Sequence, residues 1–265
     1  MGGLVFGVDD LIRPVVEGLR QRPASRRRLA VILTTEGGYI EVVQRIVDTF
    51  RHHYEHVTFI IPNYAFSAGT VLAMSGDDIF MDYYSRLGPI DPQVPDANGR
   101  LVPALGYIKQ WEQLIEKANE GSLNTAEYYL LTNGFDQAAL YQYEQARQLS
   151  ITLLKEWLVK YKFKDWTVTA TRQVPVTPTM KEERAEKIAE ELNDTGRWHS
   201  HGHGISMALL RDDPKLNIQI DDLGSDPVRH QTVRQYYSLL DDYTAKRGYT
   251  SVLHAVGNVS FFGTN

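Results

Sequence analysis

A serine and a pair of glycines in the first third of the chain have the residue types and spacing that acyl transfer requires. An apolar run at residues 29–35 leads into Gly37-Gly38, and a second run at 57–62 leads into Ser67-Ala68. A serine at a strand-to-helix turn lies at the helix N-terminus, where backbone N–H groups have no partner within the helix and can stabilise an oxyanion. A glycine turn lets a second N–H approach the substrate closely, because glycine has no Cβ. We therefore expect Ser67 as the nucleophile and an oxyanion hole formed by Gly37, Gly38 and Ala68.

Ser67 also has an ordinary interpretation. Serine is among the most favoured residues at the N-cap of a helix, where its side chain accepts a hydrogen bond from the first turn. The neighbouring Ala68-Gly69 and the upstream glycine turn favour the nucleophile over the cap.

The periodicity of apolar residues predicts the elements that position these turns. We expect strands at residues 29–35, 57–62 and 78–81, and a short strand at 216–220. We expect helices at residues 40–50, 67–74, 106–119, 135–161, 180–192 and 233–243, with a linker over residues 167–180. Strands that alternate with helices favour parallel βαβ units, so the predicted fold class is α/β.

Composition excludes several classes of protein. The chain has 265 residues, a net charge of −5 and no cysteine, so disulfides, thiolate catalysis and cysteine-bound zinc are excluded. The negative charge gives no case for nucleic acid binding. No apolar run has the roughly 20 residues of a membrane span, and the N-terminus lacks the pattern of a signal peptide. We expect a cytoplasmic protein without a membrane span.

Four motifs in order carry a resemblance to a known family. They are Thr35-Glu36-Gly37-Gly38, Tyr64-Ala65-Phe66-Ser67-Ala68-Gly69-Thr70, Leu87-Gly88-Pro89-Ile90-Asp91-Pro92-Gln93, and Gly196-Arg197-Trp198 followed by His201. Together they resemble the ClpP/crotonase fold and, within it, the SppA-like serine peptidases of the serine dehydrogenase proteinase family. Glu36 departs from the resemblance, because proline is usual at this position. Its carboxylate either lies close to the expected oxyanion hole or faces solvent.

The resemblance implies a ClpP/crotonase-like parallel βαβ superhelix with a helical C-terminal extension. On this view residues 1–165 form the core with a helical arm. Residues 166–265 form a linker and a C-terminal helical extension packed on the core. The resemblance also implies a closed homo-oligomer, a trimer or a hexamer, and the clustered tyrosines at 128, 129, 141 and 143 support an interface.

A nucleophilic serine needs a base. ClpP-type enzymes place a histidine where this chain has Ile90-Asp91-Pro92, so a Ser-His-Asp triad is not expected. SppA-type enzymes use a lysine, and the spacing in that family fits both Lys109 and Lys117. Lys109 follows an apolar helix start and is expected under apolar side chains, whereas Lys117 lies among glutamates. We therefore expect Lys109 as the base, with Lys117 as the alternative.

Other polar residues are weaker candidates for the site. His199, His201 and His203 alternate as they would on one face of a strand, but no fourth ligand is in view, so no metal is expected. His201 best matches the family position and, with Asp91, is a candidate for the substrate side of the site. Asp91 is equally explained as a turn residue between prolines. No cofactor is expected.

These observations favour an ATP-independent serine peptidase of SppA type, which hydrolyses peptides or unfolded proteins through a serine acyl-enzyme with a lysine base. Two alternatives stay open. One is a crotonase-type acyl-CoA enzyme, which uses a similar oxyanion hole without a nucleophilic serine. The other is a non-catalytic scaffold or peptide-binding module with the same fold.

Overall fold

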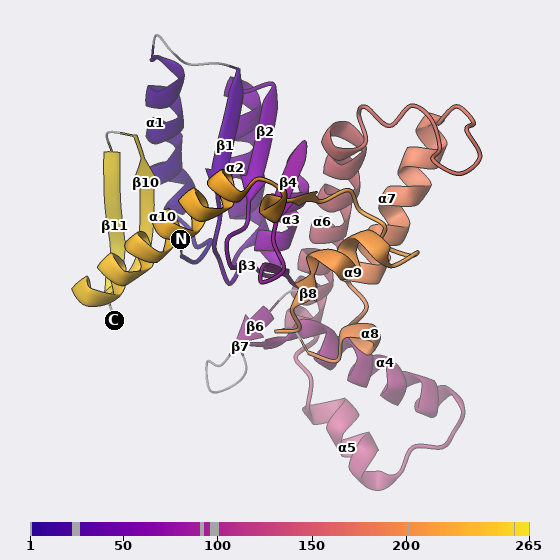
Figure 1. Cartoon of the computed structure of the whole chain (residues 1–265). Coiled ribbons are helices and arrows are strands. Elements are labelled where there is room, and N and C mark those ends of the chain that lie inside the picture. The colour runs from indigo at the N-terminus through magenta and orange to yellow at the C-terminus, as the bar shows by residue number, and fades with distance from the viewer. Residues whose placement is uncertain are drawn as a thin grey trace.

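The structure is a computed structural model that describes residues 2–22, 27–90, 93–95, 101–200, 202–256 and 258–264. Four parallel strands form its central sheet (Figure 1). They are β1 (Arg28–Ile32), β2 (His56–Ile60), β4 (Asp78–Met81) and β9 (Asp221–Asp222), and they lie in the order β1-β2-β4-β9. The three strands expected in the first 90 residues are thus present, and they pair in parallel.

Helices with an apolar face pack beside this sheet. α1 (Val8–Arg20) packs on α2 (Ile40–His53), which contacts β2 and α3 (Ala68–Met74). Val43, Ile46 and Val47 of α2 recur at helical spacing and are at most 1% exposed. All seven residues of α3 are buried, as an almost entirely apolar helix requires.

A second, smaller sheet connects the sequence motifs. It consists of β3 (Tyr64–Ala65), β5 (Arg86–Leu87) and β8 (Ile205–Ser206), with β3 parallel and β8 antiparallel to β5. β3 leads into Ser67 and β5 leads into Gly88, so the pairing of Ala65 with Leu87 brings together two motifs that are distant in the sequence.

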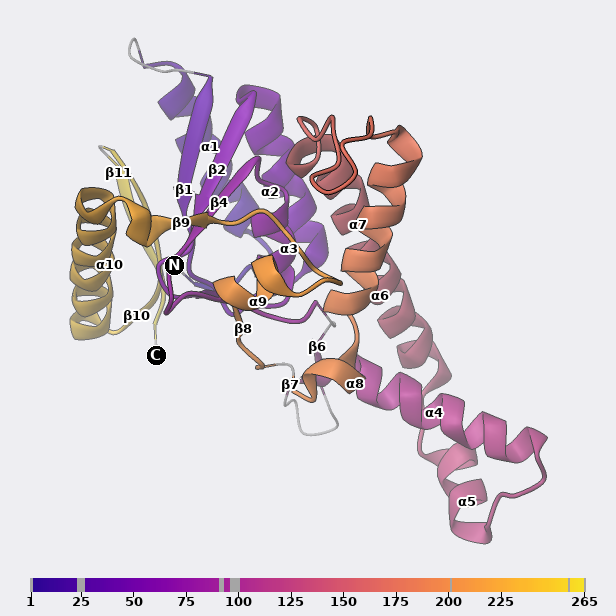
Figure 2. The ribbon, with the colours of Figure 1, turned by 45° about the vertical axis from the view of Figure 1, so that its right-hand side comes forward.

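A helical arm follows the antiparallel hairpin of β6 (Gln93–Pro95) and β7 (Leu101–Pro103). Its helices are α4 (Ala104–Asn119), α5 (Thr125–Asn133) and α6 (Gln137–Trp157), which continues as a π-helical turn at Leu158–Lys162. The α4–α5 end projects away from the body, whereas α6 packs on α3 and α7 (Pro178–Leu192) (Figures 1 and 2). The sequence expectation did not include α5, although Asn124 and Glu127 form the capping box that marks its start.

The C-terminal part contains α8 (Thr195–Trp198), α9 (Met207–Asp212), a 3₁₀ turn (Leu223–Ser225) and α10 (Pro227–Arg247). It ends in an antiparallel hairpin of β10 (Tyr249–Ala255) and β11 (Asn258–Thr264), which the sequence expectation did not include. The strand expected at residues 216–220 is wrong. Leu216, Ile218 and Ile220 do alternate into the core, but these residues form no strand ladder, and β9 starts only at residue 221.

A buried carboxylate anchors α10 to the body. Asp82, which follows β4, is hydrogen-bonded to His230 Nε2 at 2.9 Å and to Arg234 of α10. Arg234 also donates to the carbonyl oxygen of Pro62 at 2.8 Å. Burial raises the pKa of Asp82, but the hydrogen bonds from His230, the Tyr84 backbone and Arg234 outweigh it and hold this pKa below its ordinary value.

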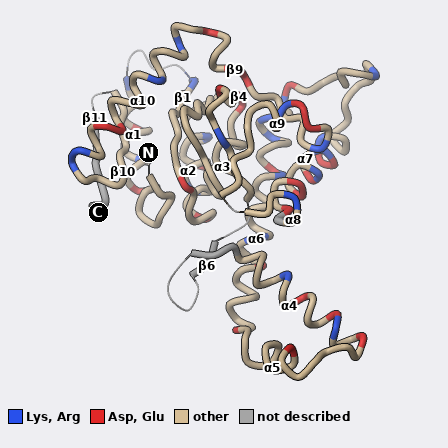
Figure 3. Tube along the Cα trace, turned by 60° about the horizontal axis from the view of Figure 1, so that its bottom comes forward, with Lys and Arg blue, Asp and Glu red and all other residues tan. Residues whose placement is uncertain are grey.

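Positive and negative residues are interspersed over the helices (Figure 3). Among the helices in the described ranges, none combines the length and apolar character that crossing a membrane requires.

Candidate active site

The glycine turn after β1 and the serine turn after β3 lie against each other. Phe66 N–H donates to Thr35 O at 3.0 Å, and Thr35 N–H donates to Tyr64 O at 3.1 Å. A Cβ built on Gly37 would lie 2.7 Å from Phe66 O and 2.9 Å from Ser67 Cβ, too close for any side chain. Gly37 also has a φ of 103°, so glycine is required there on both grounds.

Ser67 has an unusual backbone conformation. Its φ of 52° and ψ of −122° lie outside the regions that non-glycine residues normally occupy. Such strain costs about 1–3 kcal/mol and is typical of functional sites, including the sharp strand-to-helix turns of nucleophilic serines. The side chain of Ser67 makes no capping hydrogen bond to α3. The N-cap interpretation therefore does not explain this serine.

Backbone N–H groups in both turns are uncommitted. The N–H groups of Gly38 and Ala68 make no hydrogen bond within the described part of the chain. The N–H of Gly37 instead donates to Thr35 Oγ1 at 3.0 Å. Gly37 thus lets the two turns approach because it has no side chain, and the N–H groups of Gly38 and Ala68 stay without a hydrogen-bond partner among the described residues.

Thr70 ties the serine turn to the Leu87–Gly88 motif, a role that the sequence reasoning missed. Its side chain is fully buried, and its Oγ1 donates toward Ala65 O at 2.8 Å or Gly88 O at 2.9 Å. It also accepts from Gly88 N–H at 2.9 Å. Thr70 closes the Tyr64–Thr70 motif, and its place there was the sequence signal for this contact.

Lys109 lies on α4 with its side chain 47% exposed, and its Nζ is 3.8 Å from Asp194 Oδ1. The expectation that apolar side chains cover it is wrong. Leu105 and Ile108 occupy the buried face of α4, and Lys109 follows Ile108 by about 100° around the helix, which turns it outward. Asp194 is therefore a neighbour of Lys109 that the sequence reasoning did not consider.

Lys117 and Lys162 are committed elsewhere. Lys117 Nζ binds Glu127 Oε1 at 2.5 Å, and the same carboxylate completes the capping box of α5. Burial lowers the pKa of Lys162, which would favour a neutral amine. Its Nζ, however, donates to Asp77 O, beyond the C-terminal end of α3, whereas Ser67 precedes the N-terminal end of that helix.

The remaining candidates either show no contact with the serine among the described residues or lie outside those residues. Asp91 and His201 are not among the described residues. His199 has a φ of 58° and lies in a bend, so the strand expected for the three histidines is wrong at the positions described. Among described residues, no three acidic or histidine side chains are grouped closely enough to hold a metal. Glu36 is exposed to solvent.

The motif Gly196-Arg197-Trp198 has a packing role. Arg197 pairs with Glu191 at 2.5 Å and with Asp213, and Trp198 Nε1 donates to Glu191 O at 2.7 Å. These contacts join the end of α7 to the segment after α9.

Parallel βαβ units with a strained serine at the start of a buried helix define a ClpP-like α/β fold, as expected from the sequence. A family model described as ClpP-like SDH-type serine proteinase matches residues 7–165. The chain belongs to this family.

Similar proteins include two from Methanocaldococcus jannaschii. The uncharacterized protein MJ0137 is 31% identical over 208 residues, covering 78% of this chain and 58% of that protein. The uncharacterized protein MJ1495 is 24% identical over 218 residues, covering 82% of this chain and 58% of that protein. This chain thus spans 58% of the length of both relatives. Among solved structures, ClpP1 from Listeria monocytogenes has 11% identity and a TM-score of 0.41, covering 83% of this chain and 88% of that chain.

Proposed function

We propose that the protein is a serine endopeptidase that acts without ATP through a Ser67 acyl-enzyme. The observation that carries this proposal is the conformation of Ser67: a strained, non-capping serine that precedes the uncommitted N–H of Ala68 and packs against the glycine turn that carries the uncommitted N–H of Gly38. A structural serine would gain nothing from the strain. Membership in a family of serine proteinases supports the same chemistry.

In the proposed reaction, Ser67 Oγ attacks the carbonyl carbon of a peptide bond while its proton passes to a lysine amine. The N–H groups of Gly38 and Ala68 stabilise the oxyanion that forms. The intermediate collapses by breaking the C–N bond, the lysine returns the proton to the leaving amine, and water hydrolyses the ester of Ser67.

Lys109 is the base that we favour. It is the first lysine after the serine, and Lys117 is engaged in the capping of α5. To act as the base, its amine must leave Asp194 and reach the Ser67 hydroxyl. General-base assistance contributes about 10²–10⁴-fold, which is the loss expected for Lys109→Ala. Full activity in Lys109→Ala together with loss in Lys117→Ala would move the assignment to Lys117.

Labelling with a fluorophosphonate, which reacts with activated serines, tests the proposal. Wild-type protein should become labelled at Ser67, and Ser67→Ala should not. A folded wild-type protein that fails to react, at every oligomeric state obtained, would favour the non-catalytic scaffold instead.

We also propose that peptides or unfolded segments are the substrates and that the active form is a closed homo-oligomer, a trimer or a hexamer. Exposed tyrosines on the arm support the oligomer. Tyr128, Tyr129 and Tyr141 are 62%, 69% and 67% exposed, so they are available for contact with another subunit.

A further inference from the structure

The two edges of the central sheet differ in how they are protected. One edge is β9, which has only two residues, both aspartates. Short strands and charges at an edge prevent pairing with other strands. The other edge is β1, which has five residues, four of them apolar, and carries neither an inward charge nor a proline after Arg28. Only β1 is therefore built to accept a further strand.

The sequence of β1 is typical of a strand in the middle of a sheet. Leu29-Ala30-Val31-Ile32-Leu33 is a continuous apolar run, as found in parallel strands covered on both sides. Yet no residue of β1 itself is buried, whereas Phe59 of β2 and Ile79 of β4 are 0% exposed. The apolar surface of β1 is thus only partly covered in this structure.

The backbone of β1 has unused hydrogen-bonding groups on its outer side. Leu33 N–H donates to Ile60 O at 2.9 Å, so alternate residues turn their polar groups toward β2. Ala30 and Ile32 turn theirs to the other side, and within the described residues no hydrogen bond reaches them. Further along the same side, Thr34 O accepts from Gly2 N–H at 3.1 Å, and Leu4 forms a parallel bridge with Gly38. Strand-like pairing on this edge is thus already present beside Thr34 and stops short of β1.

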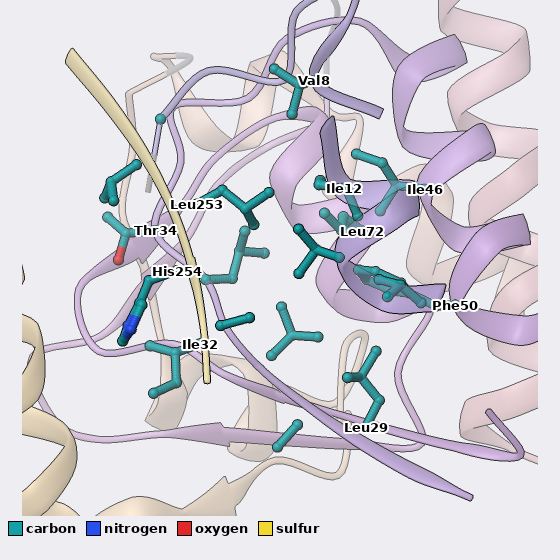
Figure 4. A pocket seen from close by; sticks show the side chains of 18 of the residues that line it. Val8, Ile12, Leu29, Ile32, Thr34, Ile46, Phe50, Leu72, Leu253 and His254 are labelled. Carbon is teal, nitrogen blue, oxygen red and sulfur yellow. The ribbon is translucent and has the colours of Figure 1, made fainter. Parts of the chain in front are cut away.

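A cavity of about 400 Å³ lies beside this unused edge. Figure 4 shows its walls: Leu29 and Ile32 of β1, Ile12 of α1, Phe50 of α2, and Leu253 and His254 of β10. All residues from 29 to 34 line it, so the cavity follows the edge of the strand and not one face. The five residues of β1 extend over about 16 Å, the length of a short added strand.

We infer that this cavity is a binding site for a single extended peptide segment, supplied by another polypeptide, that pairs with β1. The occupant is one strand and not the edge of a second sheet, because α1 and β10 form walls of the same cavity. It pairs with the N–H and C=O groups of Ala30 and Ile32, and its apolar side chains cover the partly exposed residues of β1. Strand addition of this kind takes its affinity from main-chain hydrogen bonds and its specificity from alternate side chains.

Titration of the full chain with a labelled peptide tests the inference. The probe is a fluorescent peptide with alternating valine and threonine residues and a lysine tail, followed by anisotropy. We expect saturable binding, and amide hydrogen exchange at Ala30 and Ile32 should become slower when the peptide is bound. A peptide methylated on alternate backbone nitrogens should bind about tenfold more weakly or worse, because it loses at least two hydrogen bonds.

A pair of matched variants locates the site. Ile32→Lys places a charge in the cavity and should abolish binding, whereas Leu11→Lys, on the 40% exposed Leu11 of α1 outside the cavity, should bind as the wild type does. The hydrogen-exchange measurement on wild-type protein decides the question if Ile32→Lys does not fold. Equal binding of the methylated peptide, or unchanged exchange at Ala30 and Ile32 in the saturated complex, would overturn the inference.

Discussion

At the scale of single residues, the candidate site depends on a backbone conformation that costs free energy. Ser67 keeps its strained φ because its neighbours leave no alternative. Gly37 packs directly against it, and Thr70 fixes the following turn through hydrogen bonds on both sides. Several contacts together hold the backbone of Ser67 in this strained conformation. Such support is expected where a candidate nucleophile must be held at one position.

Substitutions at Ser67 distinguish a role in acylation from a role in the stability of the fold. Ser67→Ala should lose all fluorophosphonate labelling while the free energy of unfolding changes by less than the typical N-cap loss of about 1 kcal/mol, since no capping bond is lost. Ser67→Gly should be at least as stable as Ser67→Ala, because glycine tolerates the positive φ. Urea unfolding of the three proteins measures both comparisons. A clearly larger loss in Ser67→Ala would indicate that the serine is structural.

Thr70→Val should lower both stability and labelling. Valine matches the shape of threonine but removes the hydroxyl, which leaves the buried Gly88 N–H without its partner at a cost of about 1–3 kcal/mol. Thr49→Val is the control, because the Thr49 hydroxyl donates to Arg45 O within the surface helix α2. Thermal unfolding and the rate of labelling should change for Thr70→Val and stay close to wild type for Thr49→Val. Wild-type labelling by a folded Thr70→Val would show that Thr70 does not position the serine.

At the scale of elements, the close contact of two turns creates the candidate oxyanion hole. Gly37→Ala would place a methyl group 2.7 Å from Phe66 O, at a φ of 103°. We expect labelling to be lost and stability to fall by about 1–3 kcal/mol through backbone strain. Gly106→Ala is the matched control on α4, where nothing lies within 4 Å, and there alanine should stabilise the helix by about 0.5–1 kcal/mol. If Gly37→Ala were labelled at the wild-type rate, the contact between the turns would not matter for catalysis.

The attachment of α10 should depend on pH. The pKa of Asp82 is lowered in the folded state, so its contribution to stability is present above the ordinary carboxyl pKa and is lost as the pH falls through the folded-state value. Asp82→Asn should therefore cost about 3–5 kcal/mol at pH 6, because it breaks a buried charge pair, and less at pH 3. Urea unfolding at the two pH values gives the difference. Asp242→Asn, on an exposed ion pair of the same helix, should change stability little at either pH.

The division of the chain at residues 165 and 166 remains a prediction. No helix or long strand occurs between Lys162 and α7, which suits a linker. Two strands from beyond this point nevertheless complete the sheets of the first part, since β8 pairs with β5 and β9 pairs with β4.

At the scale of the whole molecule, the arm is the feature that we expect to contact other subunits. None of the residues of α5 is buried, and the arm projects from the body (Figure 2). We expect light scattering to give a mass three or six times that of one chain. Tyr129→Glu should shift this mass downward, because a charge would be buried at the interface. Tyr83→Glu, at a 79% exposed tyrosine away from the arm, should leave the mass unchanged. A monomer at micromolar concentration would contradict the proposed assembly.

The sequence by itself determined the α/β class, the early strands and the turns that carry Ser67 and Gly37-Gly38. These features are local: apolar periodicity, glycine turns and the motif order are all read within short segments. The same holds for α2 and α3, whose apolar residues recur at helical spacing and whose structure agrees with the expectation.

Only the tertiary structure decided which residues surround the serine. Thr70 meets Gly88 because β3 pairs with β5, and Lys109 meets Asp194 because the start of α4 lies beside α8. The exposure of Lys109 also depended on which face of α4 is packed, a choice made by distant helices. The open edge of β1 could not be predicted from its local sequence either. The sequence of a strand does not show on which side a neighbouring strand is absent. Contacts of this kind join residues far apart in the chain, and they arise from packing that no local pattern contains.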